Sequence, residues 1–179
     1  MRYVGGTVAL VVLLALGGCS GTPRPHVVDP LPRDEPITVV AFAVDPAGIR
    51  YDGAVEAMGI RLAGEIADGL RRKGRTAQAV ATLPADVRGT IVRGRITTID
   101  GGSRATRFWI GFGAGGASVA TDGEVVRADG SRVAPFKAVR SSSGMADMFG
   151  GESGGLVDKC VRAVGADIAE MVDTSHYEE

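Results

Sequence analysis

One motif in this chain has the spacing of a serine nucleophile. Ser153 lies in Gly-Glu-Ser-Gly-Gly, which matches the Gly-x-Ser-x-Gly pattern of the nucleophile elbow and precedes a predicted helix. A serine nucleophile needs a general base within hydrogen-bond distance, and His26 and His176 both fall outside the domain predicted below. The spacing leaves open a Ser-Lys pair of Ser153 with Lys137 or Lys159. We keep serine hydrolase chemistry as an alternative and expect this segment to cap the helix that follows.

A second motif, Gly-Phe-Gly-Ala-Gly-Gly at residues 111–116, matches the letters of the dinucleotide fingerprint. That fingerprint works only where a helix follows the glycines, and residues 117–121 are typical of a strand. We therefore expect no cofactor. Asp122, Glu124 and Asp129 lack the spacing of a calcium loop, so we expect them to be solvated and expect no metal site.

The composition excludes several function classes. The 179 residues include 20 Lys and Arg against 21 Asp and Glu, a net charge of −1, which argues against a nucleic-acid partner. Two Cys, two His and no Asn leave few ways to build a zinc site or a Cys-His-Asn triad. Cys160 falls on an apolar helical stripe and is expected to be a small core residue. We expect the protein not to be an enzyme.

The N-terminus has the pattern of a secretion signal. Arg2 precedes an apolar run of 13 residues, 4–16, which is shorter than a membrane-spanning helix and is followed by two glycines and Cys19. This ending resembles the bacterial lipobox. The resemblance implies cleavage before Cys19, a diacylglyceryl thioether on its sulfur, and acylation of the new amine with a fatty acid such as palmitate.

Acylation at Cys19 predicts the location of the protein. Several acyl chains hold a protein on a bilayer far more firmly than one chain does. Ser20 follows the cysteine where an inner-membrane retention signal has Asp, which implies the outer membrane of a Gram-negative cell, with the domain facing the periplasm. The expected organisation is a signal peptide (1–18), a lipidated, Pro-rich linker (19–36), one domain (37–173) and a polar tail (174–179).

Hydrophobic periodicity predicts the elements of the domain. An apolar, β-branched run at 37–44 predicts a buried strand, and apolar residues at three- and four-residue steps predict a helix over 54–73, whose Gly59 and Gly64 would allow close packing on the sheet. Strands are expected at 76–80, 87–99, 108–111, 117–128 and 132–140, with an Asp-Gly hairpin at 128–131 and a loop at 141–155. Within 87–99, Gly89 and Gly94 indicate a bulge or a close backbone approach.

A second helical stripe completes the domain. Its apolar members are Leu156, Val157, Cys160, Val161, Val164, Ile168, Met171 and Val172. The order strand, helix, several strands, helix predicts an α+β fold with a mostly antiparallel sheet and two helices packed on one face.

One segment concentrates aromatic residues. Phe108, Trp109 and Phe112 lie within five residues, beside Arg107 and Gly113. As core residues the rings would close the domain; as surface residues they would bind a protein partner or the bilayer interface. Strand alternation places Phe108 and Ile110 on one face and Trp109 on the other, and on this ground core packing of the rings is favoured. The alternative, which our functional hypothesis uses, is a partner-binding surface made of Arg107, Phe108, Trp109, Phe112 and Gly113.

The ordered pattern resembles a known family. Its residues are the lipobox, the Pro-rich spacer, the strand at 37–44, Val-Arg-Gly-Arg-Ile at 92–96, Gly-Ser at 102–103 and Arg-Phe-Trp-Ile-Gly-Phe-Gly-Ala-Gly at 107–115. The chain resembles bacterial lipoproteins recorded as domain of unknown function 4410. That family has no assigned activity, so the resemblance supports an envelope location and supplies no catalytic residues. The outline also resembles accessory lipoproteins of outer-membrane export or assembly, at the level of fold only.

These observations predict a non-enzymatic outer-membrane lipoprotein. It would be an assembly, accessory or structural protein of the cell envelope, with a protein partner or further copies of itself. The alternative is a periplasmic binding module for an anionic or polymeric ligand. Its anion contacts would be Arg93, Arg95, Arg104 and Arg107.

Overall fold

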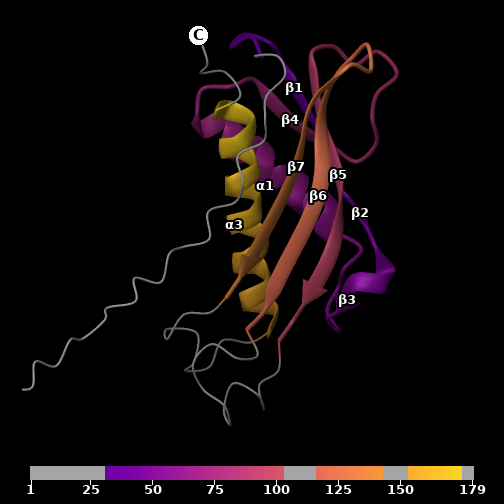
Figure 1. The fold of residues 1–179 in the computed structure, drawn as a ribbon, viewed down its shortest axis with the longest axis vertical. Helices are drawn as coiled ribbons and strands as arrows, with labels where there is room; N and C mark the ends of the chain where they lie inside the picture. The colour runs from indigo at the N-terminus through magenta and orange to yellow at the C-terminus, as the bar shows by residue number, and fades with distance from the viewer. Residues whose placement is uncertain (1–30, 103–115, 143–152, 175–179) are drawn as a thin grey trace, which may run out of the picture.

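The computed structural model describes residues 31–102, 116–142 and 153–174 (Figure 1). These residues form one sheet and two long helices that share a single hydrophobic core. The elements in chain order are β1 (Ile37–Val40), β2 (Ala43–Val44), the 3-10 helix η1 (Pro46–Gly48), β3 (Ile49–Arg50), α1 (Met58–Arg72), β4 (Ala77–Val80), β5 (Thr90–Asp100), β6 (Ser118–Arg127), β7 (Arg132–Ser141) and α3 (Ser153–Thr174).

The sheet is mixed, which corrects the expectation of a mostly antiparallel one. Its strand order is β4-β1-β5-β6-β7, and the short strands β2 and β3 also pair with β5. β1 is parallel to both β4 and β5, whereas β5, β6 and β7 form the expected antiparallel meander. β1 and β4 are parallel because α1, which lies between them in the chain, returns the chain to the end of the sheet where β1 begins.

The strand predicted at 37–44 is two strands, β1 and β2. Between them the backbone N–H of Phe42 donates to the carbonyl of Gly59 (3.2 Å), at the start of α1. The Phe42 ring is buried and packs against Phe136 of β7, with ring centroids 6.2 Å apart. Burial of this aromatic ring favours the inward turn that interrupts the strand.

The first helix begins at Met58, four residues later than expected. Its residues Met58, Leu62, Ile66 and Leu70 are buried, as the periodicity predicted, while Val55 is partly buried just ahead of the helix. The second stripe is confirmed in full, because all eight of its apolar residues are buried in α3.

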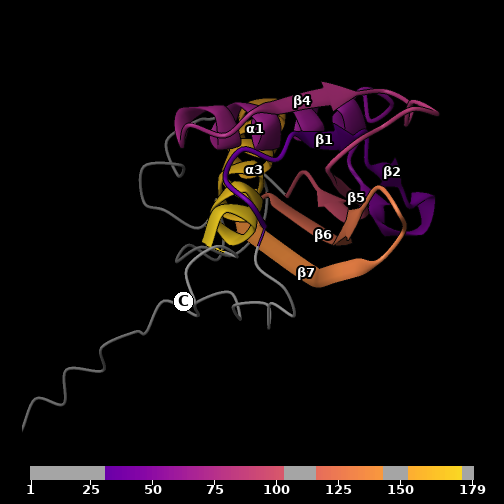
Figure 2. The ribbon, with the colours of Figure 1, turned by 90° about the horizontal axis from the view of Figure 1, so that it is seen from above.

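The two helices share one core on one face of the sheet. α1 packs against β4 and β1, α3 packs against β6 and β7, and the helices contact each other (Figure 2). At their crossing a Cβ on Gly69 would lie 2.7 Å from the Ala169 side chain, so the absence of a side chain permits the close approach. The Arg61–Asp158 ion pair (2.6 Å) joins the helices at one end.

Turns join the strands of the meander. The Asp-Gly hairpin is confirmed: Gly130 has φ +85, and both the backbone N–H and the hydroxyl of Ser131 donate to Asp129. These hydrogen bonds lower the pKa of the Asp129 carboxyl. The register shifts on β5 between Ile96 and Thr98, so no bulge lies beside Gly89 or Gly94. The alternative, a close backbone approach, is confirmed, because a Cβ on Gly89 would lie 2.3 Å from the Pro36 carbonyl oxygen and a Cβ on Gly94 would lie 2.5 Å from the Asp122 carbonyl oxygen.

Several predicted features lie outside the described residues. They are the signal peptide, Cys19, most of the linker, the predicted strand at 108–111, most of the loop at 141–155, and residues 175–179. No helix in the described part of the chain is long and apolar enough to span a membrane.

Two glycines of α1 provide a matched test of this packing. A Cβ on Gly59 would lie 2.0 Å from the Phe42 carbonyl oxygen, whereas a Cβ on Gly64 would have no heavy atom within 4 Å. The expectation of close packing is thus right for Gly59 and wrong for Gly64. We expect Gly59→Ala to lower the free energy of unfolding by about 1–3 kcal/mol, and Gly64→Ala to raise it by up to about 1 kcal/mol. Chemical denaturation of both variants measures this, and equal effects of the two substitutions would contradict the packing described.

Candidate functional site

The face of β5–β7 turned away from the helices carries a ladder of charged side chains. Arg93 lies opposite Glu124, and Arg95 lies opposite Asp122, across the β5–β6 pair. Alternation along each strand places all four on one face. Arg95 Nε lies 3.1 Å from Asp122 Oδ1, and Arg93 Nη2 lies 2.9 Å from Glu124 Oε1. Asp122 and Glu124 are therefore ion-pair partners, not merely solvated carboxylates as the sequence suggested.

Glu124 is shared between two arginines. Its Oε1 accepts from Arg93, and its Oε2 accepts from Arg132 of β7 (2.7 Å to Nη2). Hydrogen bonds from Arg132 and Arg93 lower the pKa of the Glu124 carboxyl. The hydrogen bond and charge of Asp122 raise the pKa of the Arg95 guanidinium in the same way. The ladder thus joins three neighbouring strands.

A shallow depression lies between the rungs of this ladder. Its volume is about 440 Å³, and Gly94 and Gly123 line it together with Ala43 and the five charged residues of the ladder. The glycines pair directly across β5 and β6. On their other side a Cβ on Gly94 would lie 2.8 Å from the Phe42 ring, and a Cβ on Gly123 would lie 2.5 Å from the Phe136 ring. The contact between the Phe42 and Phe136 rings thus requires that positions 94 and 123 carry no side chain.

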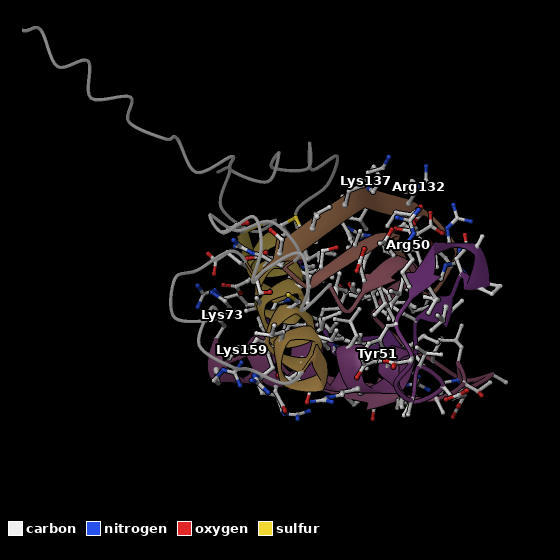
Figure 3. All side chains as sticks on the ribbon, turned by 90° about the horizontal axis from the view of Figure 1, so that it is seen from below. Arg50, Tyr51, Lys73, Arg132, Lys137 and Lys159 are labelled. Carbon is white, nitrogen blue, oxygen red and sulfur yellow. The ribbon has the colours of Figure 1, made fainter. Side chains whose placement is uncertain are left out.

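β7 extends this polar surface toward the edge of the sheet. Figure 3 shows Arg132 and Lys137 of β7 pointing away from the helices, while Lys73 and Lys159 lie on the helix side. Lys137 lies opposite Asp122 in register. In this part of the outer face, the cations Arg93, Arg95, Arg132 and Lys137 thus outnumber the carboxylates of Asp122 and Glu124. An anionic ligand at Arg93 or Arg95 would have to displace a carboxylate that each arginine already contacts.

A second feature is the docking of residues 31–36, which the sequence assigned to the linker. Leu31 is buried in the core, and the carbonyl of Pro32 accepts from Arg75 Nη2 (2.9 Å). Thr90 Oγ1 donates to Glu35 Oε1 (3.1 Å), and the backbone N–H of Thr90 donates to the Pro36 carbonyl (2.9 Å). We call residues 31–36 the strap. It fixes the N-terminal chain to the end of the sheet where β1 and β5 begin.

Arg75, which follows α1 in the chain, is the buried charged residue that contacts the strap. It is 5 % exposed, and its burial lowers the pKa of the guanidinium, while the charge of Asp173 at the end of α3 raises it. An arginine stays protonated under such a shift. The Pro32 carbonyl also accepts from the backbone N–H of Glu35 (3.3 Å), within the strap. Arg75 is the donor that joins this carbonyl to the rest of the domain, so it positions the strap.

The predicted site residues are distributed as follows. Cys19 and the segment with Arg107, Phe108, Trp109, Phe112 and Gly113 lie outside the described residues, as does Arg104. Cys160 is buried in α3, as expected for a small core residue. Ser153 begins α3, and Lys137 lies in β7. The segment after the 111–116 glycines is strand β6, which confirms that the dinucleotide fingerprint lacks its helix.

Sequence reasoning missed both the ladder and the strap. The ladder does have a signal: Arg-Gly-Arg at 93–95 and Asp-Gly-Glu at 122–124 are opposite charges at period two on neighbouring predicted strands. The only sequence signal for the strap is Leu31, an apolar residue within a Pro-rich stretch. Among the described residues, no group of three or more His, Cys, Asp or Glu could hold a metal ion.

The ladder predicts a pH-dependent stability. Glu124→Gln should lower the thermal unfolding midpoint at pH 7, because it removes a carboxylate that two arginines share. The folded-state pKa of Glu124 is lowered, so its contribution is complete above the unfolded value of about 4.3 and disappears as the pH falls through the folded value. The variant and the wild type should therefore converge in acid. Glu56→Gln, at an exposed position away from the ladder, is the control; equal midpoints for Glu124→Gln and wild type at pH 7 would contradict the prediction.

Comparison with known structures relates this fold to others. The chain is similar to PelC from Paraburkholderia phytofirmans, solved as a dodecamer in two crystals. In one, identity is 15%, the TM-score is 0.58, and the match covers 87% of this chain and 97% of that one; in the other, identity is 14% and the TM-score is 0.57. Protein XCC0632 from Xanthomonas campestris matches with 12% identity and a TM-score of 0.48, over 86% of this chain and 91% of that one.

Sequence comparison identifies the family. None of the curated proteins compared with the chain matches it. The model of the family described as "Domain of unknown function (DUF4410)" matches residues 37–146, from the first residue of β1 to beyond the end of β7. The match includes both the ladder and the predicted aromatic segment. It covers more than half of the chain, and the protein therefore belongs to the DUF4410 family.

Proposed function

We propose that this protein is a lipoprotein, anchored in the outer membrane through Cys19, that acts without catalysis as a self-assembling accessory component of the cell envelope. The observation that carries the proposal is the fold match to PelC. It spans 97% of a chain whose crystals contain dodecamers. The lipobox pattern at Leu16-Gly17-Gly18-Cys19 supports the anchor independently.

The strap supports a short tether to the membrane. Leu31 is buried in the core, so only the residues between Cys19 and Leu31 would separate the lipid from the domain. Twelve residue steps separate the two positions, which limits the reach to about 40 Å. A tether of this length keeps the domain beside the bilayer that holds the acyl chains. It also fixes which end of the domain is tethered.

The contacts of the charged ladder favour a structural role. Arg93, Arg95 and Arg132 contact carboxylates on neighbouring strands at hydrogen-bonding distance. A catalytic site more often holds charged groups with strongly shifted pKa values in an enclosed pocket. Here the groups are at least partly exposed and lie on an open sheet face. Their geometry suits a rigid platform.

The aromatic segment is proposed to bind a protein partner. Gly102, which follows β5, and Gly116, which precedes β6, bound it on either side. The strap meets β5 at Thr90, the other end of the strand, about 33 Å from Asp100 for ten residue steps at 3.3 Å each. The segment that carries Phe108, Trp109 and Phe112 therefore starts and ends at the end of the sheet opposite the tether.

Membrane attachment is tested by Cys19→Ala expressed in a Gram-negative host. Loss of the thiol removes the only atom that can form the thioether, so we expect the protein to move from the outer-membrane fraction to the soluble periplasmic fraction. Cys160→Ala is the matched control and should stay with the membrane. Retention of Cys19→Ala in the outer-membrane fraction would contradict lipid anchoring.

The role of the aromatic segment is tested by Trp109→Ala. We expect this substitution to reduce co-purification of the partner at least tenfold while it changes the unfolding midpoint little. Phe136→Ala, which removes a ring that the structure places in the core, should instead lower the unfolding midpoint strongly. Equal losses of stability and of co-purification in Trp109→Ala would show that this ring belongs to the core.

A further inference from the structure

The main path of the sheet ends in two strands that present different edges. β4 is at one end and β7 is at the other (Figure 2). Exposed strand edges pair readily with other strands unless charges, proline or a bulge prevent it. β4 reads Ala-Gln-Ala-Val and contains neither charge nor proline. The side chains of β4 therefore do not block pairing. The strand is four residues long, and an added strand would have to displace Arg71 of α1 from the Ala77 carbonyl.

The hydrogen bonds of β4 show which of its backbone groups face outward. Ile37 N donates to the Thr76 carbonyl, and Ala41 N donates to the Val80 carbonyl, both at 2.8 Å. Because successive residues of a strand direct their backbone groups to opposite sides, the N–H and C=O groups of Ala77 and Ala79 point away from β1. The Ala77 carbonyl accepts from Arg71 Nη1 of α1 (2.9 Å), which confirms that this edge faces the helix flank and solvent.

The flank of α1 beside this edge is open and partly apolar. α3 contacts the other flank, where Arg61 pairs with Asp158. Steps of four, four and three residues place Ile60, Gly64 and Asp68 on the same flank as Arg71. Ile60 is 39 % exposed, and a Cβ on Gly64 would meet no heavy atom within 4 Å. Leu83, in the loop after β4, is 37 % exposed. The side chains of Ala77 and Ala79 pack into or against the core, and only their backbone edge faces outward. We call this edge, together with Ile60, Gly64 and Leu83, the β4 surface.

β7 offers an edge of similar length. Ser142 N donates to the Ala117 carbonyl of the β6 side (2.8 Å). By alternation, the backbone N–H and C=O groups of Lys137, Val139 and Ser141 point away from β6, toward the free edge of the sheet. Pro135, which has no N–H to donate, blocks pairing earlier in the strand and leaves the stretch from Lys137 onward open. Val139 is 60 % exposed. We call Lys137, Val139 and Ser141 the β7 surface.

We infer that copies of this protein join head to tail, with β4 of one copy adding to the Lys137–Ser141 stretch of β7 in the next. This inference rests on the self-assembly proposed above. The described residues include three exposed large apolar side chains, Ile60, Leu83 and Val139. All three lie on the two surfaces that the contact would bring together. Both helices pack on the same face of the sheet, so the extended sheet would keep its helices on one side.

The head-to-tail arrangement fits a closed ring. When a β4 surface binds a β7 surface, the resulting dimer still has one free β4 surface and one free β7 surface. Further copies can therefore add until the last copy binds the first and the ring closes. A contact between two β4 surfaces alone would stop at a dimer. The dodecamers formed by the similar PelC fold favour the first arrangement.

The first test places charges on the two surfaces in the full acylated chain, extracted in mild detergent. Leu83→Lys on the β4 surface and Val139→Lys on the β7 surface should each shift the native mass from oligomer to monomer, or raise the concentration for half-assembly at least tenfold. Both positions are exposed, so circular dichroism and the intrinsic unfolding of the monomer should change little. Ala128→Lys, at an exposed turn position outside both surfaces, is the control and should assemble like the wild type.

The second test uses a thiol cross-linker that spans about 10 Å. Gln78→Cys and Val139→Cys mark the two edges, and the wild type treated in the same way reports any reaction of the native cysteines. Neither single variant alone should give cross-linked dimers, a mixture of the two should, and the double variant should give a ladder of higher oligomers. Dimers from Gln78→Cys alone would overturn the head-to-tail arrangement in favour of β4 against β4.

The outcomes separate this inference from the proposal beneath it. A wild-type oligomer that survives both lysine variants and gives no cross-links overturns the β4–β7 contact and leaves self-assembly standing. A wild-type chain that is monomeric in its own membrane extract overturns both.

Discussion

Two glycines that face each other in the middle of the sheet set the arrangement of this fold. Gly94 and Gly123 leave the core side of β5 and β6 bare, and the rings of Phe42 and Phe136 occupy that space. To reach it, the chain at Phe42 turns inward and interrupts the first strand. The same turn brings Phe42 against Gly59, where α1 begins. The break between β1 and β2 and the position of α1 both follow from this one packing arrangement.

The two ends of β5 separate the tether from the predicted partner segment. The strap docks at Thr90, and Gly102 follows the strand at its far end. A lipid anchor on Cys19, which precedes the strap, would therefore hold one end of the domain near the bilayer and present the other end away from it. The ladder of ion pairs lies between these ends and stiffens the three antiparallel strands that connect them.

Much of this fold follows from periodicity alone, because a buried helix face repeats every three to four residues and a hairpin needs its Asp-Gly turn. That is why the buried stripe of α3 and the turn at Asp129 and Gly130 could be predicted. The parallel pairing of β1 with β4 and β5 could not, since it depends on how α1 returns the chain across the sheet. The break at Phe42 depends on space created by Gly94 and Gly123, more than fifty residues later. The strap could not be predicted, because its proline content is typical of a linker. The burial of Leu31 shows that it belongs to the domain.

The central claim is that this chain works as an assembly of its own copies on a membrane. The most direct measurement is the native mass of the wild-type acylated protein, extracted from the membranes of its host in mild detergent and corrected for bound detergent and lipid. The account predicts a single closed species with a fixed number of copies well above two, alone or with a partner at constant ratio. A monomer across the accessible concentration range would contradict it.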